Sequence, residues 1–61
     1  LTQREHEILT LLAEGSSTNE ISSTLKISKH TVRNHIQNVL FKLQVSSRLK
    51  AINLSRRLGM I

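Results

Sequence analysis

One apolar stripe constrains the fold of this chain more than any other feature. Between residues 28 and 43, apolar side chains recur at positions i, i+4, i+7, i+8 and i+11, which is the spacing of one helix face. The pattern predicts an amphipathic helix over about residues 28–43, with the apolar face buried and the opposite face exposed. The stripe consists of Val32, Ile36, Val39, Leu40 and Leu43.

Capping boxes mark the starts of two helices before the long one. Thr2 is followed three residues later by Glu5, and Ser17 by Glu20, so each pair can satisfy two free backbone amides. The first helix should end at Gly15, because glycine readily adopts the left-handed conformation that closes a helix. The second helix should be short and lead into the turn before the long helix.

Serines mark the starts of the long helix and of a fourth helix. Ser28 should cap the long helix, and Ser46 or Ser47 should cap a last helix that runs to about Leu58 and is closed by Gly59. Four helices with short connections predict an all-α, compact four-helix domain. One side of the last helix should pack on the core, and it consists of Ala51, Leu54, Ser55 and Leu58.

Charge is distributed unevenly along the 61 residues. The net charge is +5, yet all four acidic residues lie among the first twenty, and residues 21–61 carry eight of the nine bases. Such a one-sided field is typical of a protein that binds a polyanion, either nucleic acid or an anionic membrane, although a merely solvated basic surface is the alternative. No cysteine is present, which excludes disulfides and thiolate metal sites, and no apolar run is long enough to span a membrane.

A short helix, a turn and a longer helix with a polar outer face form a helix-turn-helix arrangement. An ordinary solvent-facing helix would mix Glu with Lys, whereas this outer face has no acid. Arginine can pair with guanine, and asparagine or glutamine with adenine, so the face suits DNA. Because the first residues of a recognition helix reach base edges, we expect base reading by His30, Arg33, Asn34 and Gln37. Contacts to the DNA backbone are expected from Ser28, Lys29, Thr31, His35, Asn38 and Lys42.

Four segments resemble a known family along the whole chain: LTQREHEIL, AEGSSTNEIS, ISKHTVRNHIQNVLFKL and VSSRLKAINLSRRLG. They are similar to the LuxR-type, or NarL/FixJ-type, C-terminal helix-turn-helix domain of bacterial transcription regulators. The resemblance implies that residues 1–61 are the output domain of a longer regulator, which binds double-stranded DNA in the bacterial cytoplasm and needs no cofactor. It also suggests RNA polymerase as a partner. In the family, the positions that generally face DNA correspond to Lys29, Thr31, Arg33, Asn34, His35 and Gln37.

Three residues depart from the family pattern. Ser16 replaces a usual apolar residue, so the turn after the first helix should be held less tightly. Ser22 replaces a common alanine and is small enough to keep the helix crossing. Gln44 stands where glycine often ends the recognition helix, at a cost of about 1 kcal/mol if the residue adopts positive φ.

The last helix has a second face that suggests self-association. Its Leu49 and Ile52 have no obvious partner within the chain, and the family uses this helix for dimerisation. We therefore expect a weak homodimer on an operator with repeated half-sites, although an ordinary exposed Leu and Ile is the alternative. The predicted dimer face consists of Leu49, Ile52, Asn53 and Arg56.

Two other functional classes share some of these features. The promoter-binding region of a sigma factor and a basic helical module for an acidic protein or membrane surface are the alternatives to a LuxR-type domain. His30 and His35 point in different directions on a helix, so no metal site is expected, and no acid, base and nucleophile suggest an enzyme. Phe41, the only aromatic residue, is expected to pack under the chain termini or the last helix rather than to stack on bases.

Overall fold

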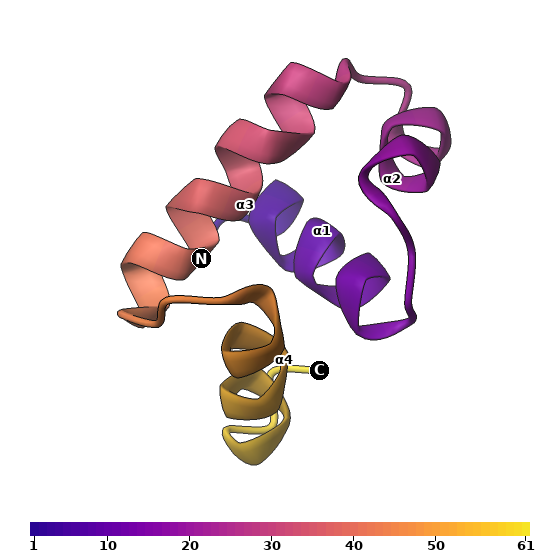
Figure 1. The fold of residues 1–61 in the computed structure, drawn as a ribbon. Helices are drawn as coiled ribbons and strands as arrows, with labels where there is room; N and C mark the ends of the chain where they lie inside the picture. Colours follow the sequence, from indigo (N-terminus) through magenta and orange to yellow (C-terminus); the bar gives the residue numbers. More distant parts are fainter.

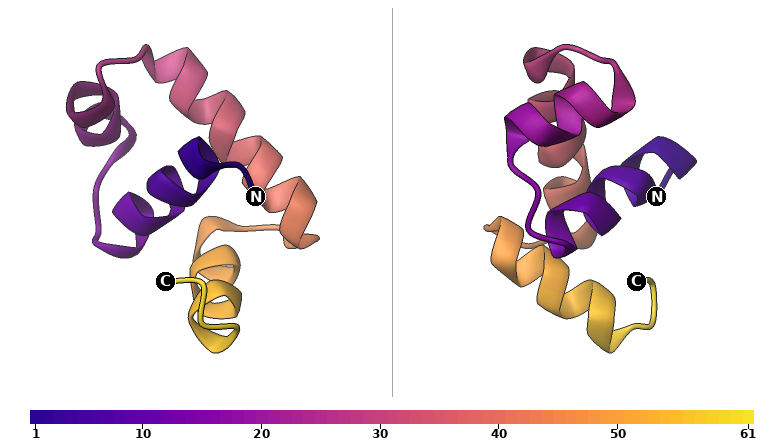
Figure 2. Two further views of the ribbon diagram at one scale, coloured as in Figure 1. Left: turned by 180° about the vertical axis from the view of Figure 1, so that it is seen from behind. Right: turned by 90° about the vertical axis from the view of Figure 1, so that its right-hand side faces the viewer.

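A computed structural model describes residues 1–61 as four α-helices without a strand. Figure 1 shows α3 as the long diagonal element, with α2 beside its N-terminal end and α4 beyond its C-terminal end. The views from behind and from the side in Figure 2 show α1 lying between α2 and α4. The predicted all-α fold is confirmed. The helices are α1 (Gln3–Ala13), α2 (Thr18–Leu25), α3 (Lys29–Leu43) and α4 (Arg48–Arg57).

Each helix starts at a hydroxyl side chain that accepts a hydrogen bond from the amide three residues later. The starts of α1 and α2 are complete capping boxes. The Glu5 carboxylate also accepts a hydrogen bond from the Thr2 amide (2.9 Å), and the Glu20 carboxylate accepts one from the Ser17 amide (2.8 Å). Ser47, rather than Ser46, caps α4. The predicted starts are therefore confirmed. The four capping residues are Thr2, Ser17, Ser28 and Ser47.

All four helices also end in the same way. A residue with positive φ follows the helix, and the amide of the next residue donates to a carbonyl five positions back, as in a Schellman motif. At α1 that donor is Ser16, whose amide lies 3.0 Å from the Leu11 oxygen, so the serine keeps the closing bond. The residues with positive φ are Gly15 (91°), Lys26 (58°), Gln44 (57°) and Gly59 (73°).

The core lies on the inner side of α3. A first core cluster joins α1, α2 and α3, and a second core cluster joins α1, α3 and α4. The partly buried Leu40 and Ile52 pack against both clusters, and Leu43 packs against the second. The predicted apolar stripe is thus the inner face of α3. The first core cluster consists of Ile8, Leu12, Ile21, Val32 and Ile36, and the second of Leu9, Val39 and Ala51.

The turn between α2 and α3 is fastened by Ser22. Its hydroxyl donates to the Ile27 carbonyl at 2.5 Å, and the Ile27 amide donates back to the Ser22 carbonyl at 3.2 Å. Serine at this position therefore does more than keep the two helices close. It holds the turn that sets their relative placement.

The last helix packs differently from its predicted pattern. Ala51 and Ser55 are buried, and the Ser55 hydroxyl donates to the Ala51 carbonyl at 2.7 Å, but Leu58 is 61% exposed. The prediction that Leu58 packs on the core is wrong, because α4 ends at Arg57 and the chain turns at Leu58. Ile52 does have intramolecular partners, since it packs against both core clusters.

Phe41 is also placed differently from the prediction. Its side chain is 83% exposed, so it packs under neither the termini nor α4. The helical register explains this position, because Phe41 lies opposite the buried stripe of α3.

Replacing Gln44 with glycine should stabilise the domain. Gln44 holds φ at 57°, a conformation that strains residues with a Cβ atom. We expect Gln44→Gly to raise the free energy of unfolding by about 0.5 to 1 kcal/mol in urea titrations. The matched control is Gln37→Gly within α3, which should lower it by about the same amount. Equal destabilisation by both changes would show that position 44 carries no strain.

Candidate nucleic-acid interface

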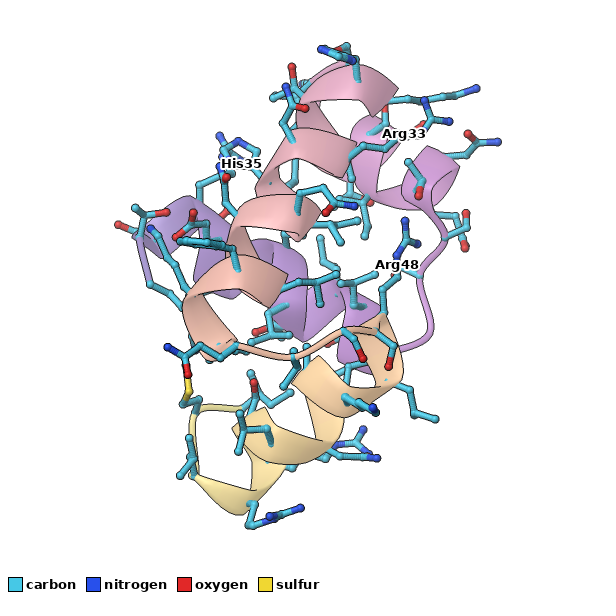
Figure 3. All side chains as sticks on the ribbon, turned by 60° about the vertical axis from the view of Figure 1, so that its left-hand side comes forward. Arg33, His35 and Arg48 are labelled. Atoms are coloured by element: carbon cyan, nitrogen blue, oxygen red, sulfur yellow. The ribbon has the colours of Figure 1, made fainter.

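The outer face of α3 is exposed, free of acid and polar apart from Phe41. His30, Asn34, Gln37 and Asn38 are all exposed on the side opposite Val32, Ile36 and Val39. Arg33 lies on the flank toward α2, and His35 lies on the other flank (Figure 3). Since residues 21–61 contain no carboxylate, nothing on this helix repels a phosphate. The four predicted base-reading residues are thus brought together, and their role remains a prediction.

The hydroxyls at the start of α3 already have partners. The Ser28 oxygen accepts from the Thr31 amide at 3.0 Å and donates its proton to the Thr31 hydroxyl at 2.9 Å. Thr31 therefore keeps a free proton for a phosphate, whereas the Ser28 hydroxyl is used for capping. Among the other predicted backbone residues, Lys29 and Asn38 are exposed, and His35 is partly buried.

Lys42 is directed toward α1, although its side chain stays 45% exposed. Its ammonium donates to the Glu5 carboxylate at 2.7 Å, and Glu5 is only 3% exposed. The hydrogen bond from Lys42 and that from the Thr2 amide lower the pKa of Glu5 from 4.5 to about 2, against the opposing effect of burial. The role of Lys42 as a phosphate contact stays a prediction, and the structure adds that its ammonium already donates one hydrogen bond to Glu5.

Sequence reasoning recognised Glu5 only as a capping residue. A signal for its burial was present, since Glu5 precedes Ile8, Leu9 and Leu12 at helical spacing and so belongs to the inner stripe of α1. The partner could not be found in the same way, because Lys42 is 37 positions away.

Comparison with known proteins decides the family. The family model for "Bacterial regulatory proteins, luxR family" matches residues 1–55. The chain belongs to the luxR family. The predicted LuxR-type resemblance is confirmed, and with it the prediction of a DNA-binding domain of a transcription regulator rather than an enzyme. The match also favours this family over the sigma-factor and acidic-surface alternatives.

Individual relatives agree with this luxR assignment. The transcriptional regulatory protein DesR of Bacillus subtilis is 48% identical over 59 residues, covering 97% of this chain and 30% of DesR. The spore germination protein GerE of the same organism is also 48% identical over 59 residues, covering 97% of this chain and 80% of GerE. The chain thus spans less than a third of DesR but most of GerE.

Two solved structures superpose closely on the chain. The transcription factor GerE has a TM-score of 0.93 and 55% identity, covering 98% of this chain and 90% of that chain. The response regulator ChrA of a heme-sensing two-component system has a TM-score of 0.95 and 38% identity, covering 100% of this chain and 30% of that chain.

The predicted dimer face of the luxR domain is only partly available. Leu49 is 66% exposed and Asn53 is exposed, but Ile52 faces the core. The Arg56 guanidinium donates to the Ala13 carbonyl at 3.2 Å, which ties α4 to the end of α1. The expectation that Ile52 lacks an intramolecular partner is therefore wrong, and Leu49 is the one large apolar side chain exposed on this face.

The structure contains no group of three His, Cys, Asp or Glu side chains that could hold a metal ion, and no pocket. No helix is long and apolar enough to cross a membrane.

The ion pair between α1 and α3 predicts a specific pH dependence. Because folding lowers the pKa of Glu5 from 4.5 to about 2, its contribution to stability is full above about pH 4.5 and is lost as the pH falls towards 2. Glu5→Gln keeps an oxygen for the Thr2 amide but removes the charge beside Lys42. We expect it to lower the free energy of unfolding at pH 7 by about 1 kcal/mol. The free energy of unfolding should also fall less steeply than in wild type as the pH drops from about 4.5 to about 2.

Urea unfolding between pH 2 and 7 would measure both effects. Glu7→Gln is the matched control, because Glu7 pairs with Arg4 at 3.4 Å and both side chains are about 40% exposed, so little should change. If Glu5→Gln lost stability between pH 4.5 and 2 as steeply as wild type, Glu5 would not be the source of this pH dependence.

Proposed function

We propose that α3 enters the major groove of an operator and reads its sequence, while α2 crosses the phosphate backbone. The observation that carries this proposal is the acid-free, exposed outer face of α3, held outward by the buried Val32, Ile36 and Val39. A helix presented in this way fits the major groove, and its polar side chains match the donor and acceptor patterns of base pairs.

The reading residues are proposed to divide the work by position. Arg33 and Asn34 lie within the first two turns of α3, with His30 before them and Gln37 after them, where base edges are within reach. Lys29, Thr31, His35 and Asn38 are proposed to bind phosphates, which sets register without specifying sequence. Lys42 joins them only with the ammonium protons that Glu5 leaves free.

The domain is further proposed to dimerise weakly on repeated half-sites. Support comes from Leu49, which is 66% exposed at the start of α4, with the exposed Asn53 one turn later. Arg56 would border this face, and Ile52 would stiffen it from within by its core packing. A twofold dimer would match an operator with two half-sites.

The wider setting is proposed from the relatives. DesR, of which the chain spans 30%, supports a role as the output domain of a longer regulator. Binding at a promoter in the bacterial cytoplasm would then alter the access or recruitment of RNA polymerase.

Removing a base-reading side chain should relax sequence preference at one position. We expect Arg33→Ala and Asn34→Ala each to cost roughly 1 to 3 kcal/mol on the preferred duplex and much less on a duplex changed at the base pair that is read. The preferred duplex would be selected from random sequences by wild-type binding, and affinities would be measured by fluorescence anisotropy.

Lys29→Ala is the matched control in the same helix. It should weaken binding to all duplexes about equally, because a phosphate contact carries no sequence information. A uniform loss for Arg33→Ala and Asn34→Ala as well would assign those residues to phosphates.

The dimer proposal makes a separate prediction about stoichiometry. Leu49→Asp places a charge where two copies would meet, so we expect binding to two half-sites to lose its cooperativity while binding to a single half-site changes little. Sedimentation of the protein–DNA complexes would measure this. Leu58→Asp, at a leucine exposed at the other end of α4, is the control. Unchanged cooperativity in Leu49→Asp would rule out this face.

A further inference from the structure

The basic side chains of α4 differ in their hydrogen-bond and ion-pair partners. The Lys50 ammonium donates to the Ser46 hydroxyl at 3.2 Å, and Arg56 is bound to the end of α1. The ion pairs of the structure are Arg4 with Glu7 and Lys42 with Glu5, so Arg48 has no carboxylate partner. Arg48, the first residue of α4, is exposed.

Arg48 reaches from α4 to α2. Its guanidinium donates to the Thr18 hydroxyl across 3.5 Å, which is the outer limit of a hydrogen bond, and Thr18 is the first residue of α2. Figure 3 shows Arg48 on the same flank of α3 as Arg33, away from His35. A guanidinium from the last helix therefore lies beside the helix-turn-helix unit, although it belongs to neither of that unit's two helices.

The contact with Thr18 leaves most of the binding capacity of Arg48 unused. A guanidinium has five N–H donors in a fork that matches phosphate, and here one of them makes a long bond to a neutral hydroxyl. The one carboxylate of α2, that of Glu20, is held by the Ser17 amide at 2.8 Å. The exposed Arg48 guanidinium therefore has no anionic partner within the domain.

We propose that Arg48 is a DNA-backbone contact supplied by α4, and that its guanidinium binds a phosphate of the strand that passes α2. In a helix-turn-helix complex the helix before the recognition helix crosses the backbone, so phosphates pass the element that Arg48 touches. The inference rests on the proposed insertion of α3 into the groove and extends the interface to a third helix. Since Leu49 follows Arg48 directly, the first turn of α4 would contact both DNA and the second copy.

The test is the salt dependence of DNA binding by the intact 61-residue chain. Wild type, Arg48→Ala and Arg57→Ala would be titrated with the selected duplex and with a scrambled duplex between 50 and 200 mM salt. Loss of one phosphate contact lowers the magnitude of the slope of log K against log salt by about 0.9. The factor by which affinity falls between 50 and 200 mM salt should therefore be roughly 3- to 4-fold smaller for Arg48→Ala than for wild type, on both duplexes. Arg57→Ala, at the other end of α4, should keep the wild-type slope.

Two further measurements separate phosphate binding from a bracing role. Thr18→Val removes the hydrogen bond between α2 and α4 but no charge, so it should keep the wild-type slope. A set of duplexes would each have one phosphate replaced by a neutral methylphosphonate. At one of these positions the replacement should weaken binding by wild type but not binding by Arg48→Ala. Thermal unfolding would confirm that each variant is folded.

The outcomes distinguish this inference from the proposed function. An unchanged salt slope in folded Arg48→Ala, or a slope reduced equally by Thr18→Val, would overturn the phosphate contact. A wild-type protein that binds the selected and scrambled duplexes equally would overturn sequence reading by α3, while the effect of Arg48 would still be measurable on both duplexes.

Discussion

Val32, Ile36 and Val39 are almost completely buried along one side of α3, and the other three helices hold them there. Full burial of such a side chain contributes about 1.5 to 3 kcal/mol, which is a large share of the stability of a domain this small. Because the inner face of α3 is held in this way, the opposite face must point outward in one orientation. The exposed residues of the outer face of α3 thus owe their placement to side chains buried on its inner face.

Three of the four acidic side chains have partners within or next to their own helix or on α3. Glu5 is buried and paired with Lys42, Glu7 pairs with Arg4, and Glu20 closes a capping box. The pair of Glu5 and Lys42 also joins the start of α1 to the end of α3 at 2.7 Å. One interaction therefore fastens the recognition helix and removes a carboxylate from the surface.

The last helix serves the core and the surface at once. Ala51, Ser55 and Ile52 hold it against the rest of the domain, and Arg56 ties it to the end of α1. Its first turn is left facing outward, with Arg48 beside α2 and Leu49 exposed. The placement of α4 thus leaves one turn of helix exposed, and this turn carries both the proposed phosphate contact and the proposed dimer contact.

Local rules in the sequence determined the four helices, because capping boxes, closing residues and apolar periodicity depend only on neighbours along the chain. They also determined the inner stripe and the outer polar face of α3, including His30, Arg33, Asn34 and Gln37. Only the tertiary structure decided that Ile52 is packed, that Lys42 meets Glu5 and that Arg48 reaches Thr18. The physical reason is that each of these facts depends on how helices from distant segments are placed against one another, and no local pattern encodes that placement.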